Sequence, residues 1–560
     1  MNKYFFENKR IFALYVLVTP CMAVTSVLFA SSMEPLWNEV VLHNAARMQR
    51  AIGWFCLFGA LDTLCFYLHK VIRENLRFAY LAGVKRDTIA GILNMDYTAY
   101  RKNPPAYYIS LFQRDISRVN EDYFDSVCGI YRVSTASITT VYALVRYNPW
   151  ICLLNVAIGA ASVLVPKVFE RRIEVRAKEA SDKAADYQGI LSDTLSGFNT
   201  IRIFSVVERI KQQVDVHNVA SARSEKNRVV ANFSVSYISM AFTMVGYIAT
   251  IAIGVMMAYQ GKMTAGGVMA VSQLIGGILV PFEELPGFFT NLKSVKSVNE
   301  KVLSYVQVPA QDCAPDGEEL TDMRIELRDV QVRYDEDTVL KGICTTFEQN
   351  GKYMIMGESG SGKSTLAKVL LKMVPTSGGD VTVAGKSIDQ ISENALYRAV
   401  NYMQQEVFLF DDTIYNNITL YKDYPTEEVE RVIEAVGLKA YVDSLQNGIQ
   451  TVINGNGYNL SGGQKQRIGI ARSLLSGAKV IVLDEITASL DMVLGKKIED
   501  VVFGLKDVTV IWITHKITPD TMRKADDILV IRDGLVKEQG TYEQLLERKG
   551  LFYSYKTIAG

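Results

Sequence analysis

The chain contains several long apolar stretches before Phe289 and is more polar after it. Six of the apolar stretches approach the roughly 20 residues that an α-helix needs to cross a bilayer. The pattern therefore predicts an all-α transmembrane bundle of six spans. They lie near Ile11–Ala30, Ala51–Leu68, Ser126–Val145, Trp150–Val165, Tyr237–Tyr259 and Gly267–Phe289.

Basic residues concentrate in two long segments, one between spans two and three and one between spans four and five. The segments after spans one, three and five are short and carry few charges. The positive-inside bias then places both long segments and both termini in the cytoplasm. Both segments have helical spacing and are predicted to extend the spans beyond the membrane. We expect one break in each, at Asn103-Pro104-Pro105 and at Ser196-Gly197.

A change of pattern near residue 310 predicts a second domain. Val308–Gly317 contains Pro309, Pro315 and Gly317, a composition typical of a linker. From about Thr321, short β-rich runs alternate with helical ones, which indicates an α/β fold. The predicted organisation is a transmembrane domain at 1–308, a linker at 309–320 and an α/β domain at 321–560.

Charge and cysteine content exclude few classes of function. The 60 basic residues balance 60 acidic ones, so the total charge gives no argument for nucleic acid as a partner. The seven cysteines form no CxxC pair and most lie in apolar runs, where we interpret them as small fillers rather than as disulfides or metal ligands. Lys3, Lys9 and Arg10 precede an apolar run, but without a clear cleavage site an uncleaved first span is expected.

The strongest chemical motif runs from Gly357 to Ser364, Gly-Glu-Ser-Gly-Ser-Gly-Lys-Ser, and fits the P-loop pattern. A predicted strand, Tyr353–Met356, precedes it and a predicted helix, Thr365–Lys372, follows it. In such a loop backbone N–H groups surround phosphates, Lys363 reaches the β- and γ-phosphates, and the Ser364 hydroxyl ligates Mg²⁺.

A second motif, about 120 residues further on, is an apolar run from Lys479 that ends in Asp484 and Glu485. In a buried parallel strand, Asp484 would lie at the carboxyl end beside the P-loop, where it can hold the Mg²⁺ shell. Glu485 is then suited to act as a general base on the attacking water. The run by itself is equally typical of an ordinary strand end, and its distance from the P-loop favours the functional interpretation.

The run Leu460-Ser461-Gly462-Gly463-Gln464, with its continuation Lys465-Gln466-Arg467, resembles the signature of the ATP-binding cassette (ABC) transporter family. Other family elements follow in order. Gln405 resembles the Q-loop glutamine, Ser489-Leu490-Asp491 the D-loop, His515 the switch histidine, and Tyr334 the aromatic residue that stacks on adenine. The resemblance covers essentially the whole chain. Within the family, the order of six spans with long cytoplasmic extensions resembles that of the exporter-type half-transporters.

The resemblance implies an ATP hydrolase whose cofactors are ATP and Mg²⁺. It assigns catalytic roles to Glu485, His515 and Gln405, and Mg²⁺ ligation to Ser364, Gln405 and Asp484. The signature of one subunit would cap the nucleotide held by the P-loop of the other. The implied ATP-contacting residues are Tyr334, Gly357, Ser359, Gly360, Gly362, Lys363, Ser364, Thr365, Ser461, Gly462, Gly463, Gln464 and Asp491.

As a function, the resemblance implies ATP-driven export of an amphipathic molecule (a peptide, drug-like small molecule or lipid) by alternating access. The membrane would be the inner (plasma) membrane of a bacterium, with the ATPase domain in the cytoplasm. A homodimer is the simpler assembly, and a heterodimer stays open. The alternatives within transport are a lipid or lipid-linked flippase and an exporter-fold importer. The alternative of another class is an ATP-gated channel or a regulatory membrane ATPase. With no peptidase-like segment before the first span, leader-peptide processing is not expected.

Two local features concern the coupling and the substrate. Tyr97–Tyr107 and Ser196–Ser205 resemble the coupling helices that dock on the ATPase domain. The segment Asn454-Gly455-Asn456-Gly457 carries no charge where exporters usually have an acidic, basic-flanked stretch, and this departure concerns the cross-subunit contacts at that loop.

Charged residues inside the predicted spans are the candidates for substrate binding. Glu283 and Glu284 lie between Pro281 and Pro286 in span six. If they face a central cavity, they favour a cationic substrate, and otherwise they cap proline-broken backbone. Asp62 and Arg132 lie at similar depth in spans two and three and are expected to form a structural ion pair.

Overall fold

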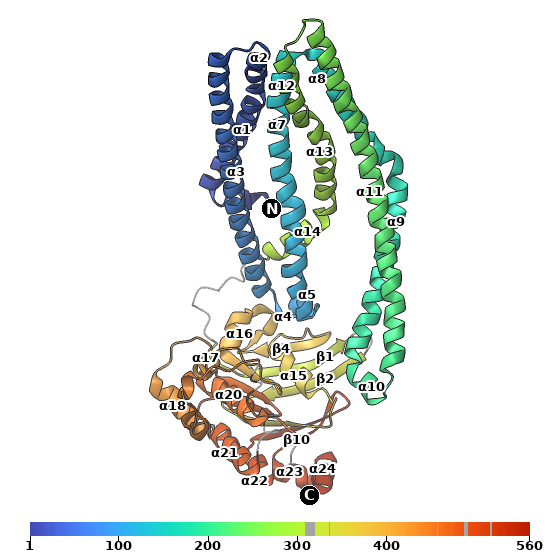
Figure 1. Ribbon diagram of the computed structural model, residues 1–560. Coiled ribbons are helices and arrows are strands. Elements are labelled where there is room, and N and C mark those ends of the chain that lie inside the picture. Colours follow the sequence, from blue (N-terminus) through green and yellow to red (C-terminus); the bar gives the residue numbers. More distant parts are fainter. Residues whose placement is uncertain are drawn as a thin grey trace. The chain divides into compact units, whose positions relative to one another are not determined.

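The chain forms two compact units in the computed structural model (Figure 1). The first unit comprises Met1–Leu93 and Asn103–Val308, and the second comprises Asn94–Lys102 and Pro309–Gly560. The predicted linker lies outside the described residues except for Leu320. The described residues are 1–308, 320–334, 337–455, 457, 459–486, 491–515 and 518–559.

The first unit is all-helical. A short 3₁₀ helix at Asn2–Phe6 begins it, and two π-helical segments at Leu111–Asp115 and Val119–Phe124 interrupt its third long helix. The α-helices are α1 (Lys9–Ser31), α2 (Met33–Val41), α3 (Ala45–Leu93), α5 (Pro105–Ser110), α6 (Ile116–Arg118), α7 (Asp125–Tyr147), α8 (Pro149–Ser162), α9 (Leu164–Ser196), α10 (Phe198–Ile203), α11 (Val207–Tyr259), α12 (Ala265–Leu274), α13 (Gly276–Ser294) and α14 (Lys296–Val306).

Five helical stretches of the described chain are long and apolar enough to cross a membrane, and the third predicted span is the exception. They are Lys9–Val41, Ala45–Leu93, Pro149–Ser196, Val207–Tyr259 and Ala265–Ser294. The exception, α7, is a 23-residue helix rich in serine and threonine that packs against α1, α8 and α13. Ser126 and Thr140 are buried there. Because its polar groups face other helices rather than lipid, α7 can be less apolar than its neighbours.

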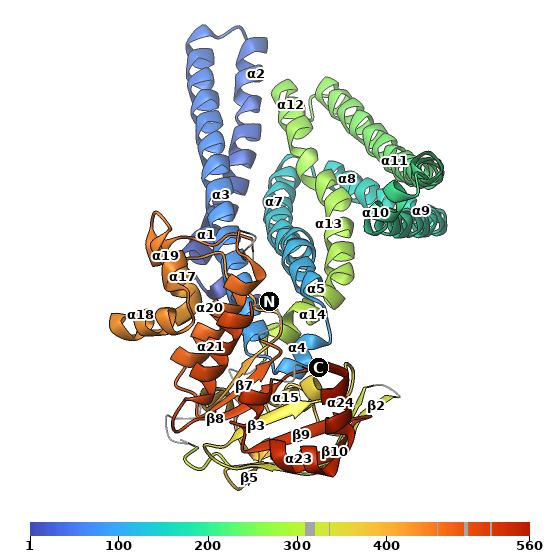
Figure 2. The same cartoon turned by 90° about the horizontal axis from the view of Figure 1, so that it is seen from below.

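The predicted extensions and breaks are confirmed. Helix α3 has 49 residues and α11 has 53. At 1.5 Å per residue each spans roughly 75–80 Å, far more than the ~30 Å hydrocarbon core of a bilayer. Helix α9 ends at Ser196 and α10 begins at Phe198, and α9 and α11 run side by side (Figure 2). The first break separates α4 (Tyr97–Arg101), which groups with the second unit, from α5 at Pro105.

The second unit holds two sheets, as the α/β prediction requires. Strands β2-β1-β4-β5 form an antiparallel four-stranded sheet. Strands β10-β9-β3-β8-β7-β6 form a sheet that is parallel except for the edge strand β10. The strands are β1 (Ile325–Tyr334), β2 (Asp337–Phe347), β3 (Lys352–Met356), β4 (Gly378–Val383), β5 (Lys386–Ser387), β6 (Val400–Met403), β7 (Val480–Asp484), β8 (Thr509–Ile513), β9 (Asp527–Arg532) and β10 (Leu535–Gly540).

Buried parallel strands bring the chemical motifs to one edge of the larger sheet. All five residues of β7 and all five of β8 are buried, as expected for strands covered on both faces. Ligands of such sheets bind outside the carboxyl ends of the strands. The helices of this unit are α4, α15 (Lys363–Val369), α16 (Glu393–Ala399), α17 (Ile414–Thr419), α18 (Thr426–Ala435), α19 (Lys439–Asp443), α20 (Gly462–Leu475), α21 (Met492–Phe503), α22 (Pro519–Met522), α23 (Tyr542–Arg548) and α24 (Leu551–Ala559).

Candidate functional site

The P-loop connects β3 to α15 and is shaped by glycines. A Cβ at Gly357 would come within 2.1 Å of the Ile531 carbonyl oxygen, and one at Gly362 within 2.6 Å of a Leu340 methyl carbon. Gly362 also has a φ of 103°, which L side chains rarely adopt. These two positions therefore require glycine. Ser359 and Gly360 are exposed at the top of the loop, while Ser364 and Thr365 are half-buried in α15.

Lys363 points back into the loop. Its ammonium donates hydrogen bonds to the carbonyl oxygens of Gly357 at 3.0 Å and Glu358 at 2.8 Å. Burial lowers the pKa of Lys363, and the carboxylates of Glu485 and Asp484 act in the opposite direction. The cation and the two carboxylates therefore occupy one site, as the two motifs predict.

Asp484 ends β7 and is almost completely buried, with 4 % of its surface exposed. The Tyr402 hydroxyl, on the neighbouring strand β6, donates a hydrogen bond to Asp484 Oδ2 at 3.0 Å. Burial, with Asp484 beside it, raises the pKa of Tyr402, so the phenol stays a protonated donor. Sequence reasoning did not find Tyr402, because the strand register that brings it to Asp484 is a tertiary property.

Glu485 follows directly and is held by two residues from other segments. The Gln405 side-chain amide donates to its Oε2 at 3.1 Å, and His515 Nδ1 lies 3.1 Å from its Oε1. The Glu485 backbone has a φ of 52°, in the left-handed region that is costly for a residue with a side chain. The structure thus brings together the three residues to which the resemblance assigned catalysis.

The signature begins α20. Ser461 is the N-cap: its Oγ accepts a hydrogen bond from the Gln464 backbone N–H at 3.2 Å, and the Gln464 side chain accepts one from the Ser461 N–H at 2.8 Å. This capping box fixes Gly462 and Gly463 in the first turn. The hydroxyl hydrogen of Ser461 is not used by the cap and is available to another acceptor.

Of the remaining residues predicted to contact ATP or to belong to the family motifs, the structure describes some and not others. Tyr334 ends β1 and is 43 % exposed, as a residue that stacks on a ligand would be. The Asp491 carboxylate caps α21 by accepting from the Leu494 N–H at 3.0 Å. Ser489 and Leu490 of the D-loop motif, and Asn456 of the uncharged loop, lie outside the described residues.

The loop and its surroundings fit ATP with Mg²⁺. The Ser361 hydroxyl oxygen is buried and has no partner among the described residues, which a phosphate oxygen would supply. No group of three or more His, Cys, Asp or Glu side chains in the described part of the chain could hold a metal by itself. The donors that are present, the Asp484 carboxylate and the Ser364 hydroxyl, fit Mg²⁺, which takes one or two carboxylates and completes its shell with water and phosphate oxygens.

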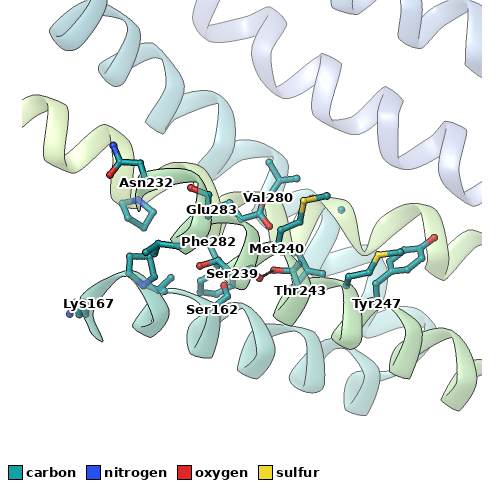
Figure 3. Close-up of a pocket in the computed structure, with 18 of the residues that line it drawn as sticks. Ser162, Lys167, Asn232, Ser239, Met240, Thr243, Tyr247, Val280, Phe282 and Glu283 are labelled. Atoms are coloured by element: carbon teal, nitrogen blue, oxygen red, sulfur yellow. Dashed lines mark hydrogen bonds between the residues drawn. The ribbon is translucent and has the colours of Figure 1, made fainter. Parts of the chain in front are cut away.

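The first unit contains a cavity of about 1210 Å³ between α8–α9, α11 and α12–α13 (Figure 3). The two adjacent glutamates of span six differ in their relation to this cavity. Glu283 lines the cavity. Glu284 instead forms an ion pair with Arg132 at 2.6 Å, both side chains being about one-third exposed.

The expected pair between Asp62 and Arg132 is therefore wrong. Asp62 accepts hydrogen bonds from the hydroxyls of Thr25 at 3.1 Å and Ser26 at 2.6 Å on the adjacent helix α1. Arg132 is engaged by Glu284 of α13, which packs on α7. Helix packing, which depth along the membrane does not reveal, decided both partners.

Comparison with known families assigns both halves of the chain. The family model described as ABC transporter matches residues 340–488, and the model described as ABC transporter transmembrane region matches residues 11–282. In its fold the chain is similar to a bacterial Atm1-family ABC exporter with ATP bound. The TM-score is 0.83 with 19 % identity, and the match covers 98 % of each chain.

Among curated relatives, similarity extends over most of the chain. An ATP-dependent lipid A-core flippase of Neisseria meningitidis is 25 % identical over 89 % of this chain and 80 % of that protein. The multidrug resistance-like ATP-binding protein MdlB of Buchnera aphidicola is 24 % identical over 98 % of this chain and 95 % of that protein. The lactococcin-A transport/processing ATP-binding protein LcnC of Lactococcus lactis is 26 % identical over 94 % of this chain and 76 % of that protein.

Proposed function

The chain belongs to the ABC transporter family as an exporter-type half-transporter, an ATP hydrolase that drives export, and from this premise we propose that two copies assemble head to tail into a homodimer. Each P-loop binds Mg²⁺-ATP, and the signature of the partner copy closes the site. In this proposal residues 1–308 are the transmembrane domain and 321–560 the ATP-binding cassette, joined by 309–320. The compartment proposed for this multi-pass protein is the bacterial plasma membrane, with the cassette in the cytoplasm.

The observation that carries the mechanism is the clamp on Glu485. Gln405 and His515 each hold one of its carboxylate oxygens, and so orient it as a general base for the attacking water. Lys363 neutralises charge on the β- and γ-phosphates. Ser364, Asp484 and Gln405 would hold Mg²⁺, which would supply further charge neutralisation to the phosphates.

The signature completes the site from the partner copy. The cap leaves the hydroxyl hydrogen of Ser461 free, so Ser461 can donate to the γ-phosphate of the facing subunit, together with the N–H groups of the first turn. Nucleotide then stabilises the closed dimer more than the open one, and hydrolysis releases it. Tyr97–Tyr107 and Ser196–Ser205 are the proposed relays to the membrane helices. The grouping of Asn94–Lys102 with the second unit supports the first of them.

The cargo proposed is an amphipathic molecule. The 1210 Å³ cavity exceeds the roughly 300–1,000 Å³ of ordinary ligand pockets, and its walls combine apolar and charged side chains. The relatives are named for lipid A-core, multidrug resistance and lactococcin, so their names point to different classes of cargo, and the amphipathic proposal rests on the walls of the cavity.

The test is the variant Glu485→Gln in purified protein reconstituted into liposomes. Without the base, steady-state ATP hydrolysis should fall by at least about a hundredfold. ATP binding should be retained, because the phosphate-binding loop is untouched, and the dimer should be trapped closed. Hydrolysis at the parent rate in this variant would contradict the base assignment, and a chain that stays monomeric with ATP would contradict the assembly.

A further inference from the structure

The Glu283 carboxylate lines the cavity of the first unit within a predicted span and has no ion-pair partner among the described residues, and from it we propose that the exported molecule is an amphipathic cation that binds Glu283. The inference rests on the proposed export function and specifies its substrate. Glu283 makes no hydrogen bond or ion pair within the described residues, although it lies inside a predicted span. The adjacent Glu284, by contrast, is paired with Arg132 at 2.6 Å and does not line the cavity.

The charge of the cavity favours a cation. Among its lining residues are three carboxylates, Glu170, Glu174 and Glu283, against the single ammonium of Lys167. A carboxylate at membrane depth is costly unless an opposite charge or hydrogen-bond donors compensate it. A cationic ligand at Glu283 supplies that compensation, whereas an anionic ligand would add repulsion.

A hydroxyl on the helix that faces Glu283 favours a ligand with N–H donors. The Ser239 Oγ is buried and has no partner among the described residues. The Thr243 hydroxyl is already used, because it donates to the Ser239 carbonyl oxygen at 3.0 Å. Figure 3 shows Ser239 and Glu283 near the middle of the cavity, on the facing helices α11 and α13. The wall that faces Glu283 thus holds an acceptor that no described residue satisfies, and a ligand that carries N–H donors besides its cationic group suits both walls.

The walls of the cavity match an apolar aromatic body. Met240, Met244, Tyr247 and Phe282 line it. In Figure 3, Tyr247 lies at one end, and Lys167 and Asn232 lie at the other. Aromatic rings and methionine sulfur are favourable neighbours for flat aromatic groups and for cations. The cavity is thus amphipathic along its length, with Glu283 between its apolar and polar ends.

The experiment measures equilibrium binding of rhodamine 6G, an aromatic cation with N–H donors, to the nucleotide-free full chain in lipid nanodiscs, by fluorescence anisotropy. The value for empty nanodiscs is subtracted. Fluorescein, an anion with the same ring system, is the charge control. The parent should bind rhodamine 6G more tightly than fluorescein. Glu283→Gln should weaken rhodamine 6G binding by roughly ten- to a hundredfold, the effect of losing a charge-assisted hydrogen bond.

Two variants separate this result from a folding defect. Glu283→Asp keeps the charge and should stay within about tenfold of the parent affinity, well above Glu283→Gln. Glu284→Gln removes the same charge one residue away and should leave binding within about threefold. Equal affinity of Glu283→Gln and the parent, a parent preference for fluorescein, or no binding above empty nanodiscs would overturn the proposal. Since no nucleotide is present, these outcomes leave the role of Glu485 in hydrolysis untouched.

Discussion

At the scale of single residues, Glu485, the proposed catalytic carboxylate, is positioned by side chains distant in the chain. Gln405 is 80 positions from Glu485, yet it donates to Glu485 Oε2 at 3.1 Å. The left-handed backbone of Glu485 is anchored by its N–H, which donates to the Ile513 carbonyl oxygen at 3.0 Å. A backbone conformation that is costly for a residue with a side chain persists only where surrounding contacts stabilise it. In Glu485 both the backbone N–H and the carboxylate have such contacts.

Tyr402 is predicted to position Asp484, the proposed Mg²⁺ ligand. Replacing Tyr402 by Phe removes the hydroxyl that donates to Asp484 and leaves the ring in place. Hydrogen bonds that orient a metal ligand typically contribute about ten- to a hundredfold to metal affinity. We therefore expect the Mg²⁺ concentration for half-maximal ATP hydrolysis to rise by about tenfold, measured at saturating ATP.

The matched control is Tyr397→Phe. Its hydroxyl donates to Glu393 at 3.5 Å, within α16. The same atom is removed, but no group of the nucleotide site loses a partner, and the Mg²⁺ dependence should match that of the parent. An unchanged Mg²⁺ dependence in Tyr402→Phe would show that Asp484 needs no such support.

At the scale of secondary structure elements, the Ser461 side chain caps the signature helix α20 and is also proposed to contact ATP. The Ser461 oxygen accepts the capping hydrogen bond, and its hydrogen remains free. Helix α23 has an equivalent capping box, formed by Thr541 and Gln544 at its own start. The chain therefore offers two similar caps, of which only one belongs to the signature.

These two caps separate folding from catalysis. Ser461→Ala and Thr541→Ala should each cost about 1 kcal/mol of stability, which is typical of a lost N-cap. Only Ser461→Ala removes a donor to the γ-phosphate, and its hydrolysis should fall by about a hundredfold. Thermal unfolding and ATP hydrolysis of both variants check this. Equal hydrolysis in the two variants would mean that Ser461 serves only as a cap.

Helix α7 shows, at the same scale, that packing against other helices allows a membrane helix to contain more polar residues. It falls short of the apolar character of the other spans, but Ser126 and Thr140 are buried against neighbouring helices and Arg132 is paired with Glu284. Its polar groups thus meet protein rather than lipid. Apolar length correctly predicted a helix there, whereas the reason it tolerates an arginine lies in α13.

At the scale of the whole molecule, the proposed sites are shared between two copies, and mixed dimers test this. Lys363→Ala disables the P-loop of one chain, and Ser461→Ala disables the signature of the other. If the sites are composite, the mixed dimer keeps one intact site, formed by the P-loop of the Ser461→Ala chain and the signature of the Lys363→Ala chain.

Nucleotide trapped per dimer is the measurement, with each chain also carrying Glu485→Gln to prevent turnover. We expect close to one ATP per mixed dimer and almost none for either variant alone. Trapping that is absent from the mixed dimer as well would place both halves of each site in one chain. Affinity tags of two kinds isolate the mixed dimer from the two parental forms.

By itself the sequence determined five of the six predicted spans, the helix at the sixth, the α/β domain and the identity of the motif residues. Helical apolar runs and phosphate-binding loops depend on residues that are neighbours along the chain, so local pattern is enough to identify them. The tertiary structure decided which side chains meet. Tyr402 finds Asp484 across 82 positions and Arg132 finds Glu284 across 152. Such contacts depend on strand register and helix packing, and for this reason only the folded chain distinguished Glu283 from Glu284.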